Sequence, residues 1–169
     1  MVDIPKGQIT VKIRRFIPHD DGIVILPHDG TTGHYQEWKT IEEDKANLFT
    51  NAGHDFIAQQ LYATSGLSTN GANWVALSDD TVIPAVTDTV VAAEITTNGL
   101  QRSQGTYAHT IGTNVTTITK TFTATATQSS RKAGLLLASV DSTLVNENTY
   151  GPVTLNNGDQ IQIIWTITA

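Results

Sequence analysis

The stretch VTTITKTFTATAT, residues 115–127, carries the clearest structural signal in this chain of 169 residues. From Thr117 onward threonine takes every second position, and Ile118 and Phe122 occupy positions between. Successive side chains of a β-strand point to opposite faces, so the pattern predicts a strand with one face in water and one in a core. Lys120 interrupts the apolar row, and we expect it to lie at the margin of the core with its ammonium in water.

Other segments repeat or complement this pattern. Residues 104–110 precede a turn at 111–114, and we expect them to form a hairpin with the long strand. Residues 133–139 are almost continuously apolar, which is typical of a strand in the middle of a sheet, and residues 160–168 alternate again. Threonine, which favours strands, contributes 27 residues. The chain is therefore expected to be mainly β, as an antiparallel β-sandwich of the jelly-roll or immunoglobulin-like type.

One segment departs from the strand pattern. Residues 46–62, ANLFTNAGHDFIAQQLY, carry apolar side chains such as Phe49, Phe56 and Ile57 at helical spacing. They predict a single amphipathic helix, and we expect its apolar face to pack on the sandwich.

Charge divides the chain unevenly. Residues 1–45 carry 14 of the 26 charged side chains, and residues 46–169 carry the other 12. This division predicts an N-terminal arm, or accessory strands, over residues 1–45 and a β-sandwich domain over residues 46–169.

The expected arm contains a clean alternating segment, residues 8–14, which predicts a half-buried strand. Such a strand could add to the sheet edge of a neighbouring subunit. We therefore take five residues of the arm as candidates for partner contacts: Gln8, Val11, Ile13, Tyr35 and Trp38. For Trp38 the alternative is that its ring packs the arm on the body of the protein.

The overall composition excludes several classes of protein. The net charge of −6 argues against nucleic-acid binding, because that function uses a basic patch. The chain has no cysteine, which rules out disulfides and thiolate metal ligands. No window approaches about 18 consecutive apolar residues, so no membrane-spanning helix is expected. The first residues lack the basic and apolar regions of a secretion signal, and we expect synthesis in a cytoplasm.

The segment IPHDDGIVILPHDGTTGHY, residues 17–35, is rich in groups that can ligate metals. His19, His28 and His34 could bind Zn²⁺ or Ni²⁺ together with the neighbouring aspartates. Their spacings of nine and six residues match no compact ligand motif. The preferred interpretation is two similar turns that flank a short strand, with a metal site as the alternative, and no cofactor is expected.

The sequence contains no recognisable catalytic motif. No Gly-x-Ser-x-Gly occurs, and neither Ser65 nor Ser78 has a nucleophile motif around it. Asp79, Asp80 and Asp88 lack the spacing of an EF-hand and are expected to be solvated turn residues. We therefore expect a protein that is not an enzyme.

Six segments between residues 46 and 169 follow one another in a recognisable order: NLFTNAGHDFIAQQLY, NWVALSDDTVIPAVTDTVVAAEIT, GLQRSQGTYAHT, TKTFTAT, KAGLLLAS and NNGDQIQIIWTI. In this order the chain resembles small structural proteins of tailed bacteriophages and related viruses. Such proteins are virion components, for example capsid decoration (cement) proteins or tail-associated proteins. The resemblance leaves residues 1–45 unmatched and carries over no catalytic residue.

The resemblance implies a function in a virus particle assembled in the host cytoplasm. We expect a capsid decoration protein that bridges neighbouring capsid subunits, with the major capsid protein or another virion protein as its partner. A homo-oligomer is expected, with a trimer as one option, and neither nucleic acid nor a membrane is an expected partner. The alternatives are a tail, baseplate or fibre-associated structural protein, and a receptor- or carbohydrate-binding module that would use Tyr35, Trp38 and Tyr150.

Overall fold

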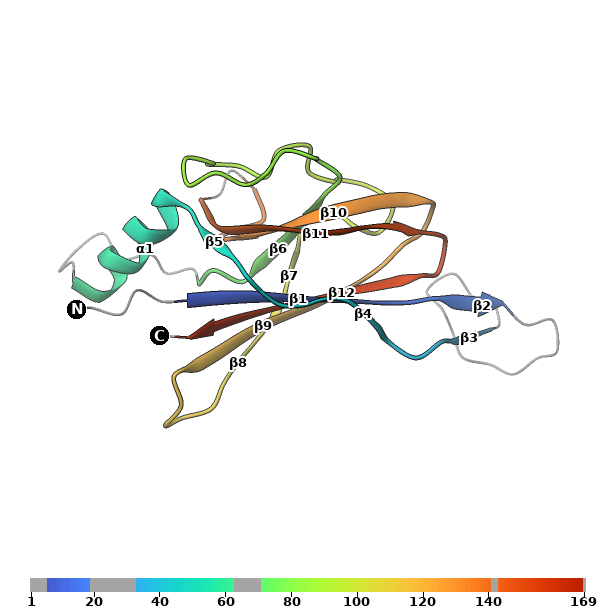
Figure 1. The fold of residues 1–169 in the computed structure, drawn as a ribbon, viewed down its shortest axis with the longest axis horizontal. Coiled ribbons are helices and arrows are strands. Elements are labelled where there is room, and N and C mark those ends of the chain that lie inside the picture. Colours follow the sequence, from blue (N-terminus) through green and yellow to red (C-terminus); the bar gives the residue numbers. More distant parts are fainter. Residues whose placement is uncertain (1–5, 19–32, 63–70, 141–142, 169) are drawn as a thin grey trace.

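The computed structural model describes residues 6–18, 33–62, 71–140 and 143–168, and these form a mainly β structure with a single short helix (Figure 1). All named strand pairs are antiparallel. The prediction of a mainly β, antiparallel fold with one helix is confirmed.

Two five-stranded sheets make up the body, and a two-stranded sheet lies beside them. The first sheet has, in spatial order, β4 (Lys39–Ala46), β1 (Lys6–Arg14), β12 (Gln160–Thr168), β9 (Val115–Thr123) and β8 (Thr106–His109). The second sheet has β5 (Leu48–Phe49), β11 (Leu144–Leu155), β10 (Gln128–Leu136), β6 (Trp74–Ser78) and β7 (Ser103–Gln104). The small sheet pairs β2 (Phe16–Pro18) with β3 (Gly33–Tyr35).

The two large sheets share one apolar core, which is the defining property of a sandwich. The first sheet contributes alternate residues of its three inner strands, and the second sheet does the same from β6, β10 and β11. The buried set from the strands includes Ile9, Val11, Val75, Leu77, Ile118, Phe122, Leu135, Leu155, Ile161, Ile163 and Trp165. The alternation in residues 115–123 and 160–165 therefore reflects real burial, and β10 lies in the middle of its sheet as the apolar run predicts.

The helix is shorter than the sequence pattern predicts. It is α1 (Asn51–Tyr62), and the expected first turn is instead the strand β5, which pairs with β11. Thr50 explains the change, because its Oγ1 accepts a hydrogen bond from the amide of Gly53 at 3.0 Å and so caps the helix. A Cβ atom on Gly53 would lie 2.3 Å from the carbonyl oxygen of Val145, so this glycine lets the helix approach β11 closely.

Residues 79–93 form an irregular segment, here called the covering loop, that crosses the outer face of the second sheet (Figure 1). Its residue Val91 is buried in a small second cluster with Ala76, Leu136 and Leu144. Gly134 makes room for it, because a Cβ at this position would lie 2.4 Å from a methyl group of Val91. The second sheet is therefore covered on both faces.

The expectation of an arm over residues 1–45 needs correction for the part that the structure describes. β1 lies between β4 and β12, and all nine of its residues pair with β12. β4 completes this edge of the same sheet. From Lys12 to Lys45, the charged side chains of these two strands are exposed or partly exposed, so the high charge of the segment is compatible with a place in the sandwich. Residues 19–32, within the same expected arm, lie outside the described residues.

Candidate interaction surfaces

Three of the predicted partner-contact residues lie on β1, and the structure separates them. Val11 and Ile13 are buried in the core, whereas Gln8 is exposed on the other face of the strand. Both edges of β1 are hydrogen-bonded within the chain, so the strand cannot add to the sheet of another subunit. The assignment of Val11 and Ile13 to a partner is therefore wrong, because the apolar face of the strand serves the sandwich. A partner contact at Gln8 stays a prediction.

Tyr35 and Trp38 both stack on one cation. The guanidinium carbon of Arg14 lies 4.1 Å from the ring centroid of Tyr35 and 4.6 Å from that of Trp38. Phe16 meets Tyr35 edge to face, with ring centroids 5.5 Å apart. Cation–π contacts of this kind stabilise a folded arrangement, which favours the alternative that Trp38 packs its segment on the body. A partner contact through the two rings stays a prediction.

Tyr150 does not fit the role of a sugar-stacking residue. Its side chain is buried, and its hydroxyl lies 2.5 Å from that of Ser130. Burial is the main cause that raises the pKa of Tyr150 above its usual value. An aromatic ring enclosed in this way cannot contact a ligand, so this candidate of the carbohydrate-binding alternative is wrong.

The predicted histidine ligands are only partly covered by the structure. His34 lies in β3, while His19 and His28 lie outside the described residues. Within the described part of the chain, no group of three or more histidine or acidic side chains is arranged to hold a metal ion. In that same part, no helix has the length and apolar character that a bilayer crossing requires.

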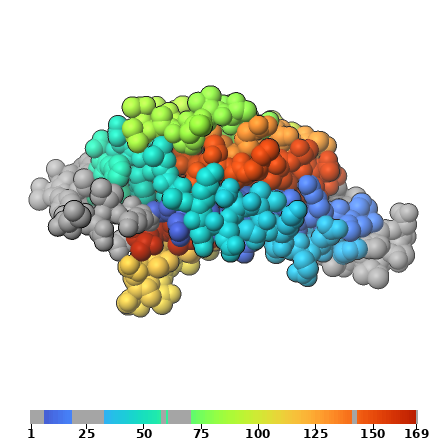
Figure 2. All heavy atoms as spheres, viewed as in Figure 1, coloured from blue at the N-terminus to red at the C-terminus, as the bar shows by residue number. Residues whose placement is uncertain are grey.

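The end of the β8–β9 hairpin is the first of two exposed apolar surfaces. Its apolar side chains are Tyr107, Ile111 and Val115, and Ile111 is 95 % exposed. No charged residue occurs from Ser103 to Thr119. The hairpin, gold in Figures 1 and 2, projects from the body of the molecule. An isolated apolar side chain on a surface is ordinary, but several on an uncharged projection mark a candidate contact site.

The two edges of the first sheet differ in their protection. β4, at one edge, carries the charged run Glu42–Lys45, and its pairing with β1 has register shifts. β8, at the other edge, is regular, all four of its residues are exposed and none carries a formal charge when His109 is neutral. Charges and irregular pairing discourage strand addition at an edge. The β8 edge lacks both devices and is therefore the more accessible edge of this sheet.

The covering loop is the second exposed apolar surface. Its outward side chains are Val82, Ile83, Val86 and Val90, and Ile83 is 81 % exposed. Hydrogen bonds hold the loop in place at both ends, where the Ser78 hydroxyl donates to Ala92 O and accepts from the amide of Asp80. In the middle of the loop, Val86 O accepts a hydrogen bond from the amide of Asn51 at 2.7 Å. Figure 2 shows this loop, light green, on the side of the molecule away from the hairpin.

A charged cluster lies beneath the covering loop. Lys132 on β10 and Glu147 on β11 are both about fully buried, with side-chain exposures of 2 % and 1 %. The Lys132 ammonium donates to Asp80 at 2.8 Å, and this bond is the main cause that holds the pKa of Asp80 below its usual value. Glu147 lies farther from the ammonium, at 3.8 Å. Burial raises the pKa of Glu147 to about 7, which the Lys132 charge partly opposes and the Asp88 carboxyl reinforces.

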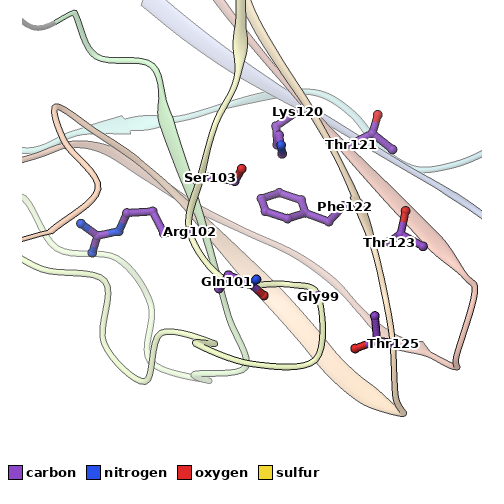
Figure 3. A pocket seen from close by; sticks show the side chains of 9 residues that line it. All are labelled: Gly99, Gln101, Arg102, Ser103, Lys120, Thr121, Phe122, Thr123 and Thr125. Carbon is purple, nitrogen blue, oxygen red and sulfur yellow. The ribbon is translucent and has the colours of Figure 1, made fainter. Parts of the chain in front are cut away.

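A polar hollow of about 350 Å³ lies beside β9 and is shown in Figure 3. In this view the ring of Phe122, which lines the hollow, is seen between Lys120 and Gln101, while the Arg102 side chain points away and pairs with Glu94. The Lys120 ammonium is 5.7 Å from the Phe122 ring centroid. This contact explains why a lysine is tolerated in the inner row of the strand.

Comparisons of the chain with protein-family models, with curated proteins and with solved structures find no match.

Proposed function

We propose that the protein is a non-enzymatic structural component of a virus particle, namely a capsid decoration (cement) protein that bridges neighbouring capsid subunits. The observation that carries the proposal is the pair of exposed apolar surfaces, the hairpin end and the covering loop, on different sheets of one sandwich. A bridging protein needs two separate contact surfaces on a body that keeps them at a fixed distance. Two packed antiparallel sheets provide such a body.

Each of the two apolar surfaces is small, which fits a weak contact that is repeated many times over a symmetric shell. Full burial of one valine or isoleucine side chain contributes roughly 1.5–3 kcal/mol, and each surface offers only a few such residues. Association costs several kcal/mol in lost freedom, so one surface alone makes a weak contact. A protein that is held at two sites gains effective concentration, and a symmetric shell repeats the gain many times.

A role in a virus particle also implies a partner, self-association and a location. The partner is the major capsid protein or another virion protein, the copies associate with one another, and the protein resides in the virion after assembly in the host cytoplasm. The resemblance of residues 46–169 to bacteriophage structural proteins supports this assignment. The stacking of Arg14 on Tyr35 and Trp38 and the burial of Tyr150 weaken the carbohydrate-binding alternative.

Immunogold electron microscopy of purified particles tests the location. Gold over the heads is the expected result and supports decoration. Gold confined to tails would overturn the decoration role in favour of the tail, baseplate or fibre alternative. Absence of gold from intact particles would overturn the structural role altogether.

Paired variants test the two surfaces. Ile111→Asp places a charge at the hairpin end and Ile83→Asp places one on the covering loop, while Thr40→Asp adds the same charge at the opposite, exposed β4 edge. We expect each of the first two variants to lose binding to particles that lack the protein, as measured by co-sedimentation, and Thr40→Asp to bind like the unaltered protein. Equal binding by all three variants would show that neither apolar surface makes the contact.

A further inference from the structure

The covering loop, together with Lys132 and Glu147 of the second sheet, lines a pocket of about 300 Å³. Its polar residues are Asp80, Thr87, Asp88 and Thr89 from the loop and Lys132 and Glu147 from the sheet, and its apolar part is formed by the exposed side chains of Val82, Val90 and Ala92. One pocket thus combines acidic groups with an aliphatic wall.

The charges in this pocket are unevenly matched. The Lys132 ammonium is committed to Asp80 at 2.8 Å and lies 3.8 Å from Glu147. Among the residues that the structure describes, no hydrogen-bond donor reaches either carboxylate oxygen of Glu147, although the side chain is only 1 % exposed. A buried carboxylate without a donor is costly, so Glu147 is a group that a ligand with donors would satisfy.

Asp88, the neighbouring acid, adds a second carboxyl group that a cation could neutralise. The Asp88 carboxyl also raises the pKa of Glu147, and its own Oδ2 already accepts a hydrogen bond from the amide of Ala85 at 2.7 Å. Two adjacent carboxyl groups resist ionising together unless a proton or a cation lies between them. Near neutral pH Glu147 therefore loses its proton, and a cation beside it would stabilise the charged form.

We propose that this pocket binds the cationic head of a lysine or arginine side chain that the docking partner presents to the covering loop. The head would donate to Glu147 and Asp88, and the stem would lie along Val82, Val90 and Ala92. This inference rests on the proposed function, because it assumes a protein partner at the loop.

The same features favour an organic cation over a divalent metal ion. Val82, Val90 and Ala92 present aliphatic side chains, whereas Ca²⁺ takes six to eight oxygen ligands. The Lys132 ammonium beside Glu147 would repel a doubly charged ion more strongly than a singly charged ammonium or guanidinium. A lysine or arginine side chain carries one charge and an apolar stem, and it matches both parts of the pocket.

Titration with n-butylamine hydrochloride, followed by NMR of the full chain, tests the pocket without a partner. We expect saturable shifts of the Val90 and Ala92 signals, with a dissociation constant roughly in the millimolar range for so small a ligand. Sodium chloride at equal ionic strength, n-butanol and Ca²⁺ should produce no saturable shifts at these residues. The affinity for n-butylamine should rise between pH 6 and pH 8, as Glu147 loses its proton.

Three variants locate the binding charge. Glu147→Gln and Asp88→Asn should each lower the affinity for n-butylamine at least about tenfold, which is what the loss of one charge-assisted hydrogen bond produces. Glu43→Gln removes an exposed acid on β4 and should leave the affinity unchanged. Three outcomes would overturn the proposal. Glu147→Gln could bind n-butylamine as tightly as the unaltered protein does, or the unaltered protein could show no saturation. The unaltered protein could also bind Ca²⁺ more tightly than n-butylamine.

Co-sedimentation with particles identifies the source of the cation. If the partner supplies it, Glu147→Gln should bind particles at least about tenfold more weakly, while Glu43→Gln binds normally. If n-butylamine binds but Glu147→Gln docks normally, the assignment to a partner side chain is overturned and a small free amine takes its place. If the unaltered protein binds no particle, the proposed function fails and the partner assignment fails with it, whereas the n-butylamine result still reports on the pocket.

Discussion

β1 and β8 belong to the same sheet but stand in opposite relations to the rest of the molecule. β1 is hydrogen-bonded to β4 and β12 and buries Ile9, Val11 and Ile13 in the core. Among the described strands, β8 pairs with β9 alone, and all four of its residues are exposed. The difference places the core-forming side chains and the exposed side chains on separate strands, so that variants of each can be tested independently.

Removal of residues 1–14 should have the largest effect. It takes β1 out of the sheet, exposes the paired edge of β12 and deprives β4 of its only strand neighbour within the described sheet. We expect loss of the cooperative thermal transition, measured by circular dichroism and calorimetry. Addition of a synthetic peptide of residues 6–14 should restore the transition in part. A cooperative transition near that of the full chain would mean that β1 is dispensable after all.

Val11→Asp and Gln8→Asp compare the two faces of β1. Val11 is 0 % exposed, so an aspartate there buries a charge without a partner and should cost at least about 4 kcal/mol of the free energy of unfolding. Gln8 is exposed, and the same new charge should cost less than about 0.5 kcal/mol. Urea denaturation measures both, and similar losses in the two variants would contradict the placement of the strand.

Glu147→Gln should change how stability depends on pH. The pKa of Glu147 is raised to about 7 in the folded protein from an ordinary 4.5, so between these values the folded state holds a proton that the unfolded state has lost. Its contribution to stability is therefore complete below about pH 4.5 and is lost as pH rises through 7. Lys132, Asp80 and Asp88 are the charged groups that act on it.

The glutamine variant lacks this titration. Between pH 5 and pH 8 the free energy of unfolding should fall in both proteins, and the fall should be smaller by roughly 1–3 kcal/mol in the variant. Urea denaturation at several pH values measures the difference. Glu43→Gln is the control, and an identical pH profile in Glu147→Gln and the unaltered protein would contradict the burial of the carboxyl.

Ile111→Asp should have the smallest effect on stability. Ile111 is 95 % exposed, so a charge there changes no buried contact and should alter the free energy of unfolding by less than about 0.5 kcal/mol. A larger loss in urea denaturation would show that the hairpin end contributes to the fold, and the contrast with β1 would weaken.

The sequence allowed much of the fold to be predicted because strand burial leaves a period of two. The rows around Ile118 and Trp165 identified their inward faces, and residues 156–159 form a turn in which Gly158 has φ 85°. Charge density misplaces β1 because it suggests an arm, whereas the alternation of Ile9, Val11 and Ile13 indicates burial.

Other features depend on register, which no local pattern supplies. Lys132 and Glu147 come together only because Gly134 pairs with Glu147 across β10 and β11. The exposure of Ile111 follows from how far the hairpin extends beyond the neighbouring strands, and its residues resemble those of any other hairpin. The start of α1 had a local signal, since Thr50 is a good N-cap residue.

Because β1 pairs with β12, one of its strand partners is synthesised long after it. Residues 15–159, which are 145 residues, separate the two strands along the chain. At about 5–20 residues per second the ribosome needs on the order of ten seconds to make them. During that time Ile9, Val11 and Ile13 emerge without the strand that will cover their edge. The growing chain, more than the finished one, is therefore the species that chaperones must keep from aggregating.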